Sequence, residues 1–238
     1  MTIEVWVDVI CPWCYLAKRR LEAALRESGG TGGVLWRSYE LVPEAPAVPG
    51  LTTVETMIGF GEDGREVTAR FARIRRLGRQ EGLTLNLPTA RPVNSFDAHR
   101  LIHLAGRYGR RGQALEAVLR AYHTDNLDIA DHDVLAGLAE QAGLDPGEAR
   151  RALALGGPLA AEDHLGELVR ADERRAAELG VRGVPAFVRG GEVVAAGLPS
   201  QQALTALLLD LHEVRGEVAG MAESFPAADA QGDVRSPR

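Results

Sequence analysis

The sequence lacks several features that would place it in a specialised class. It has no run of about 20 apolar residues, so we expect no membrane-spanning helix. Its start has no basic segment followed by an apolar one, so we expect no signal peptide. The 27 Lys and Arg residues are outnumbered by 33 Asp and Glu residues, and a net charge of −6 argues against a general nucleic-acid binder. The two cysteines are too few and too close together for a disulfide framework.

The two cysteines stand in Cys11-Pro12-Trp13-Cys14, after an apolar β-prone segment and at the start of a helical pattern. Pro12 suits the first helical position, because an N–H has no helical partner there. Cys11 then takes the N-cap, where the first amides and the helix dipole stabilise a thiolate. Cys14 lies one turn further in and is expected to stay a thiol until it resolves a mixed disulfide. In the cytoplasm, the compartment we expect, such a pair is more often redox-active or metal-binding than structural.

The remaining patterns predict the element order β-α-β, a helical block, then β-β-α. After the first strand and helix, strands are expected at residues 34–42, 186–189 and 192–196, and the last helix at about 201–214.

This order predicts an α/β fold with a discontinuous domain. Residues 1–52 and 180–216 would form one mixed sheet with helices on its faces, and residues 53–179 would be an inserted helical domain. Residues 217–238 are small, polar and proline-containing, so we expect a disordered tail.

A second motif, Gly183-Val184-Pro185-Ala186-Phe187, precedes the expected hairpin. Together with the cysteine motif after the first strand, it resembles the thioredoxin fold, and the helical insertion resembles the DsbA-like branch of that fold. The combination of four segments is similar to the FrnE-type oxidoreductases: residues 7–15, 94–101, 128–132 and 183–185. The similarity covers about residues 3–212.

The resemblance implies a thiol–disulfide oxidoreductase or disulfide isomerase. Cys11 would attack the substrate disulfide and Cys14 would resolve the mixed disulfide. Pro185 would be cis and face the cysteines, and the Val184 backbone would hold the substrate as an added strand. The central dipeptide lacks the histidine that stabilises the DsbA thiolate, so we expect a reductase or isomerase.

The expected substrate is a disulfide-bearing protein or a small thiol, with Pro12 and Trp13 in the substrate-binding surface beside the sulfur. We expect no metal and no cofactor apart from the cysteine pair, with glutathione as an optional co-substrate. We expect no nucleic-acid or membrane partner, and the oligomeric state, a dimer included, stays open.

Three alternatives remain. The scaffold is also similar to 2-hydroxychromene-2-carboxylate isomerases and kappa-class glutathione transferases, which typically have serine where Cys11 stands; Asn94 would then contact a small substrate. The protein could instead be a peptide-binding chaperone in which the thiols are incidental. The third alternative is zinc, since His99 and His103 are spaced one helical turn apart and could join the cysteines in a Cys₂His₂ site.

Two further features have two interpretations each. Asp8, just before the motif, is either a proton relay under the sulfur or a polar group that caps the first helix. The helix expected at residues 66–81 has an arginine-rich side that is either a solvated face or a surface for an anionic ligand or partner. Its arginines are Arg70, Arg73, Arg75, Arg76 and Arg79.

Overall fold

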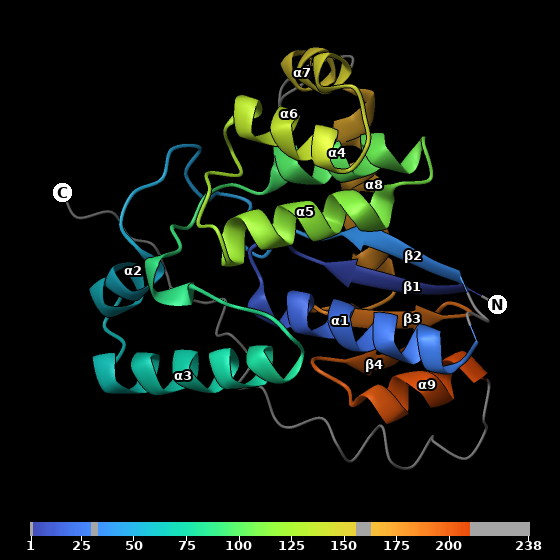
Figure 1. Ribbon diagram of the computed structural model, residues 1–238, viewed down its shortest axis with the longest axis horizontal. Coiled ribbons are helices and arrows are strands. Elements are labelled where there is room, and N and C mark those ends of the chain that lie inside the picture. Colours follow the sequence, from blue (N-terminus) through green and yellow to red (C-terminus); the bar gives the residue numbers. More distant parts are fainter. Residues whose placement is uncertain (1, 30–32, 156–162, 210–238) are drawn as a thin grey trace.

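The structure, a computed structural model, describes residues 2–29, 33–155 and 163–209 (Figure 1). In this part of the chain, strands from the two ends of the sequence form a four-stranded sheet in the order β2-β1-β3-β4. The strands are β1 Thr2–Val7, β2 Gly33–Ser38, β3 Ala186–Arg189 and β4 Glu192–Ala196. β1 and β2 are parallel, whereas β3 is antiparallel to β1 and to β4. The mixed sheet confirms the predicted α/β fold.

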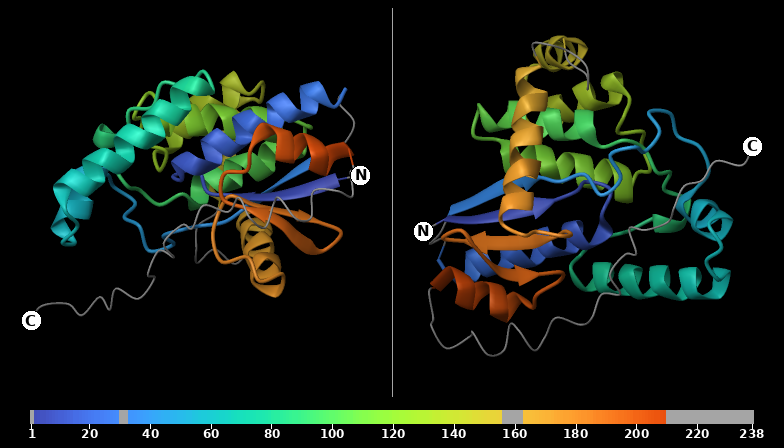
Figure 2. Two further views of the ribbon diagram at one scale, coloured as in Figure 1. Left: turned by 90° about the horizontal axis from the view of Figure 1, so that it is seen from below. Right: turned by 180° about the vertical axis from the view of Figure 1, so that it is seen from behind.

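Helices flank the sheet and fill the chain between β2 and β3. They are α1 Pro12–Glu27, α2 Thr53–Gly59, α3 Gly64–Gln80, α4 Phe96–Gly106, α5 Arg111–His123, α6 His132–Gln141, α7 Pro146–Ala154, α8 His164–Glu178 and α9 Gln201–Leu209, with a short 3-10 helix, η1, at Leu87–Thr89. α1 and α9 pack together on one face of the sheet, and α8 lies on the other face (Figure 2). In the described residues, no helix combines the length and the apolar character that crossing a membrane requires.

β1 is buried on both faces because helices cover both sides of the sheet. Val5 and Trp6 point to opposite faces and are each 0% exposed. Val5 belongs to the large apolar core, whereas Trp6 packs with Ala176 of α8. The Trp6 indole N–H also donates to the carbonyl of Asp172, 2.9 Å away. A central strand with this apolar content holds α1 and α8 in fixed positions relative to each other.

The helices between β2 and β3 share their core with the sheet. One cluster of buried side chains includes Val5 of β1, Leu16 of α1, Leu104 of α4 and Leu119 of α5. α4 packs against α5 and α8, so it links the helical block to the helix that covers the sheet. The predicted boundaries of the inserted domain, residues 53–179, stay a prediction.

β2 ends earlier than the sequence predicted. The alternation of residues 34–42 suggested one strand, but the strand ends at Ser38. Beyond it, the amide of Leu41 donates to the Asp8 carboxylate at 2.7 Å. The chain therefore leaves the sheet because a buried side chain, and not a neighbouring strand, takes that N–H.

At the C-terminal end, α9 is described as far as Leu209. The rest of the predicted last helix, up to residue 214, lies outside the described residues, as does the predicted tail at 217–238.

Candidate active site

The cysteine motif begins α1 as the sequence predicted. Cys11 is the N-cap, with extended backbone angles (φ −88°, ψ 113°), and Pro12 follows at the first helical position. The Cys11 side chain accepts no hydrogen bond from the amides of α1. Its thiol instead lies 3.7 Å from the carbonyl oxygen of Val184 and donates to it. The sulfur therefore faces the segment that precedes β3.

That segment contains the cis peptide bond Val184–Pro185, which the resemblance implied. Pro185 is buried and Val184 is half-buried. Within the described residues, neither the N–H nor the C=O of Val184 forms a backbone hydrogen bond. A polypeptide could take both groups by adding as a strand beside Cys11. The fold thus brings Pro185 to the cysteine motif, although they stand at opposite ends of the sequence.

Both cysteines are free thiols. Cys11 is 4% exposed and Cys14 is 0% exposed, so only Cys11 touches the surface. Burial raises the pKa of the Cys14 thiol well above its usual value, and contact with Cys11 raises that pKa further. Cys14 is therefore held protonated behind the sulfur that a substrate would meet.

Asp8 lies three residues before Cys11 and is 0% exposed. Its carboxylate accepts the amide of Ile10 at 3.3 Å and, as described above, the amide of Leu41. Its backbone carbonyl accepts the Cys11 amide at 3.2 Å. Asp8 therefore stabilises the turn before α1 and anchors the loop after β2. A role as a proton relay stays a prediction.

A buried polar chain leads from Asp8 to α8. His99 Nε2 lies 3.3 Å from the Asp8 carboxylate, and His99 is close enough to Glu40 to lower its pKa. Burial outweighs this effect and raises the pKa of Glu40 to about 7, although Arg170 Nη1 donates to its carboxylate at 2.6 Å. The sequence did not single out Glu40, since its burial depends on the loop that Asp8 anchors.

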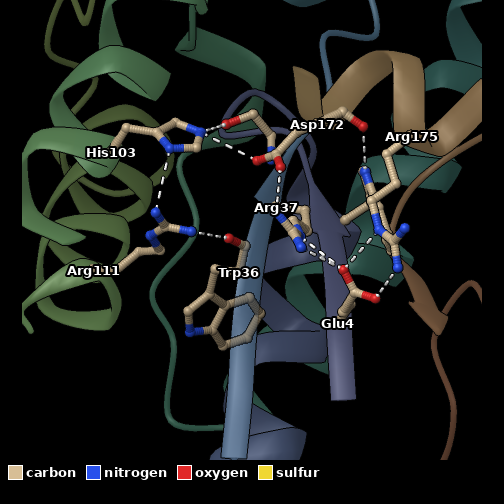
Figure 3. Close-up of polar contacts among 9 residues, drawn as sticks. Glu4, Trp36, Arg37, His103, Arg111, Asp172 and Arg175 are labelled. Atoms are coloured by element: carbon tan, nitrogen blue, oxygen red, sulfur yellow. Dashed lines mark hydrogen bonds and ion pairs between the residues drawn. The ribbon is translucent and has the colours of Figure 1, made fainter. Parts of the chain in front are cut away.

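His103, one turn further along α4, belongs to a second polar network (Figure 3). Its Nε2 is 3.1 Å from both the Asp172 carboxylate and the Ser38 hydroxyl, and Arg111 donates to its Nδ1 at 3.3 Å. Because arginine only donates, the His103 proton lies on Nε2. His99 and His103 thus contact different carboxylates. In the described residues, no three His, Cys, Asp or Glu side chains are grouped so that they could bind a metal.

Asn94 connects the loop after β2 to the start of α4 by hydrogen bonds. Its Nδ2 donates to the carbonyl of Pro43 at 2.8 Å, and its Oδ1 accepts the amide of Phe96 at 2.9 Å at the start of α4. The predicted contact of Asn94 with a small substrate is untested. Pro12 and Trp13 are half-buried, and Trp13 packs against the apolar core, so their substrate contact also stays a prediction.

His123, the last residue of α5, was missed by the sequence analysis. It is 1% exposed and lies beside the backbone of Val9 and Cys11. Its ring faces Tyr122 edge-on, with centroids 4.9 Å apart. Neither ring nitrogen has a hydrogen-bond partner in the described part of the chain, and burial lowers the pKa of His123 to about 4. No local pattern marks this residue, because only the packing of α5 brings it under the cysteine motif.

Solved structures with similar folds include redox proteins and an isomerase. A probable DsbA oxidoreductase from Streptomyces coelicolor is 32% identical, with a TM-score of 0.79 over 97% of this chain and 94% of that one. The cytosolic disulfide reductase DsbM from Pseudomonas aeruginosa is 21% identical, with a TM-score of 0.62 over 88% and 98% of the two chains. A 2-hydroxychromene-2-carboxylate isomerase is 20% identical, also with a TM-score of 0.62, over 93% and 100%. The last two likenesses show the fold alone.

The comparison with protein-family models covers nearly the whole described chain. The model of the DSBA-like thioredoxin domain matches residues 2–208, from β1 into α9. The match therefore includes the cysteine motif, the helical block and the cis-proline segment. This chain belongs to the DsbA-like thioredoxin domain family.

Proposed function

We propose that this protein is a thiol–disulfide oxidoreductase of the FrnE type that works as a reductase or isomerase in the cytoplasm. One observation carries the proposal: the Cys11 sulfur lies 3.7 Å from the Val184 carbonyl, next to a cis proline. A reactive sulfur and a backbone segment that pairs with no other strand can together hold a polypeptide disulfide at the point of attack. Family membership supports the same chemistry.

The reaction requires only the two cysteines. The Cys11 thiolate attacks one sulfur of a substrate disulfide, the substrate S–S bond breaks, and the first substrate thiol leaves. Cys14 then loses its proton and attacks Cys11, which forms the Cys11–Cys14 disulfide and releases the second substrate thiol. The substrate gains two electrons and the protein loses two; two molecules of an external thiol then restore the dithiol and leave as their own disulfide. Glutathione is a candidate for that thiol.

The burial of Cys14 orders these two steps. Because its pKa is raised, Cys14 does not compete with Cys11 for the substrate disulfide. Once Cys11 is part of a mixed disulfide, the adjacent Cys14 is the nearest thiol that can resolve it. A resting dithiol of this kind suits a reductase or an isomerase in a reducing compartment.

Insulin reduction tests the proposal. Wild-type protein with dithiothreitol should reduce insulin disulfides faster than dithiothreitol alone, and Cys11→Ser should abolish the difference. Cys14→Ser should accumulate mixed disulfides with its substrates, which would identify them. If the Cys11→Ser, Cys14→Ser double variant retains full activity in a peptide-binding assay and the wild type reduces no disulfide, the chaperone alternative replaces this proposal.

A further inference from the structure

Helix α3 exposes six arginines on the side away from its buried residues. We call this surface the arginine face; its members are Arg65, Arg70, Arg73, Arg75, Arg76 and Arg79. Several members are three or four residues apart, such as Arg75 with Arg79 and Arg76 with Arg79, and like charges at these spacings destabilise a helix. The chain as a whole carries a net charge of −6, so this concentration of positive charge runs against the composition.

Four members of the arginine face have no anionic partner among the residues that the structure describes. Arg70 donates to Glu62 at 2.6 Å. Arg65, Arg75, Arg76 and Arg79, by contrast, form no side-chain ion pair with any other residue that the structure describes. Their charges are therefore available to a ligand in solution.

Exposed apolar side chains gather in the chain between β2 and α3, and those in and just after α2 lie next to α3. Six of the eleven large apolar side chains that are exposed in the described residues fall between β2 and α3: Leu41, Val42, Val48, Leu51, Ile58 and Phe60. Phe60, at the end of α2, is 84% exposed, and Ile58 lies within van der Waals distance of Gly64 at the start of α3. Arginine and exposed aromatic side chains together are typical of protein-binding surfaces.

This surface lies beside the candidate active site. The end of α3 is tied to α1 by an ion pair between Arg20 and Glu81, 2.8 Å long. Figures 1 and 2 show that α2 and α3 lie near the end of α1 at which that helix starts, the end that carries Cys11. A polypeptide whose disulfide reaches Cys11 could therefore also lie along α3.

We propose that the arginine face, with the exposed Ile58 and Phe60 beside it, binds an acidic segment of the polypeptide substrate that reacts at Cys11. This inference rests on the proposed function and adds the substrate class: cystine-containing polypeptides with acidic and apolar residues near the disulfide. Arginine favours carboxylates because its planar guanidinium can donate two parallel hydrogen bonds.

A membrane or a nucleic acid is the less fitting partner. The apolar side of α3, which includes Val67, Phe71 and Ile74, is buried in the protein, so this helix cannot insert it into a bilayer. The overall negative charge would repel a nucleic acid over most of its length.

Binding is the direct test because it does not require turnover. The probe is a fluorescein-labelled peptide rich in glutamate and leucine, with serine in place of cysteine; the reference peptide has glutamine for each glutamate. Wild-type protein should bind the acidic probe more tightly, and the preference should disappear at high salt. Arg76→Gln, Arg79→Gln should weaken binding of the acidic probe by roughly tenfold and leave the reference peptide unchanged.

A matched variant controls for loss of net charge. Arg107 and Arg110 are exposed at the turn between α4 and α5, on a different side of the molecule (Figure 1). Arg107→Gln, Arg110→Gln removes the same charge and should retain the preference for the acidic probe. Equal loss in the two double variants, or no preference in the wild type, overturns the inference. Tighter binding to phosphatidylserine vesicles or to duplex DNA than to the acidic probe also overturns it.

Turnover separates this inference from the proposed function. With cystine-containing versions of the two peptides, kcat/KM should be higher for the acidic one in the wild type but not in Arg76→Gln, Arg79→Gln. Reduction of both peptides at one rate, without preferential binding, removes only the role of the arginine face. Reduction of neither peptide, together with inactivity toward insulin, removes the proposed function.

Discussion

Several residues around the cysteine motif are almost completely buried. Cys14, Asp8 and His123 are each at most 1% exposed, and burial shifts the pKa of Cys14 upward and that of His123 downward. In both cases the neutral form is favoured, since a charge in the apolar interior loses its hydration. Cys14 and His123 are thus held uncharged behind Cys11.

The lowered pKa of His123 predicts that the protein loses stability in acid. Its pKa falls from 6.5 in the unfolded chain to about 4 in the fold, so the unfolded state binds more protons between these values. Above pH 6.5, His123 is neutral in both the folded and the unfolded state. As the pH falls towards 4, the free energy of unfolding decreases by up to about 3 kcal/mol, because only the unfolded state takes up the proton.

His123→Phe should therefore lose less stability than the wild type when the pH is lowered from 7 to 4.5, as measured by urea unfolding. His132→Gln is the control, because the His132 side chain is 41% exposed and lies 2.7 Å from the Asp97 carboxylate, away from the cysteine motif. Parallel pH dependence in the wild type and His123→Phe would contradict the assignment.

At the scale of elements, the same residue type has different roles in two helices. Gly78 of α3 packs where a Cβ would lie 2.7 Å from Leu85 Cδ1. Gly137 of α6 has open space, with no atom within 4 Å of a Cβ. Helix propensity favours alanine at both positions by about 1 kcal/mol, so packing decides the difference between them.

Gly137→Ala should stabilise the protein by about 0.5–1 kcal/mol. Gly78→Ala should destabilise it, because overpacking costs about 1–3 kcal/mol and exceeds the gain in propensity. Thermal or urea unfolding of the two variants would check this. Stabilisation of similar size by both would show that α3 and the segment with Leu85 pack loosely.

At the scale of the whole molecule, buried polar contacts connect the sheet to the helical block, in addition to the shared apolar core. Asp172 of α8 accepts hydrogen bonds from Arg37 and from the Ser38 amide of β2, at 2.8 and 2.9 Å, and its carboxylate faces His103 of α4 (Figure 3). These contacts lower the pKa of Asp172 in spite of its burial. One carboxylate thus connects three elements that are distant in the sequence.

Asp172→Asn should destabilise the protein by about 3–5 kcal/mol, since it leaves buried donors without their anion. Glu167→Gln, on an exposed part of the same helix, should change stability by less than about 1 kcal/mol. Urea unfolding followed by tryptophan fluorescence measures both. A small effect of Asp172→Asn would mean that apolar packing alone holds α8 on the sheet.

The sequence by itself determined the local features of this protein. Cys11-Pro12-Trp13-Cys14 predicts the start of α1 because an N-cap and a proline at the first helical position act within a single turn. The sequence also predicts the strands at residues 186–189 and 192–196, because the glycine pair between them favours a tight turn. In the structure, Gly190 and Gly191 adopt the positive φ of that turn. The order of these elements, with the resemblance, was enough to predict the mixed sheet.

Only the tertiary structure decided which groups surround the sulfurs. The contact between Cys11 and Val184 spans 173 residues, and the positions of Glu40, His99 and His123 depend on how the loop after β2, α4 and α5 pack. Such contacts are absent from local sequence patterns because each depends on the packing of elements far apart in the chain. The two cysteines thus predicted the proposed chemistry, while the fold decided which buried groups surround the sulfurs.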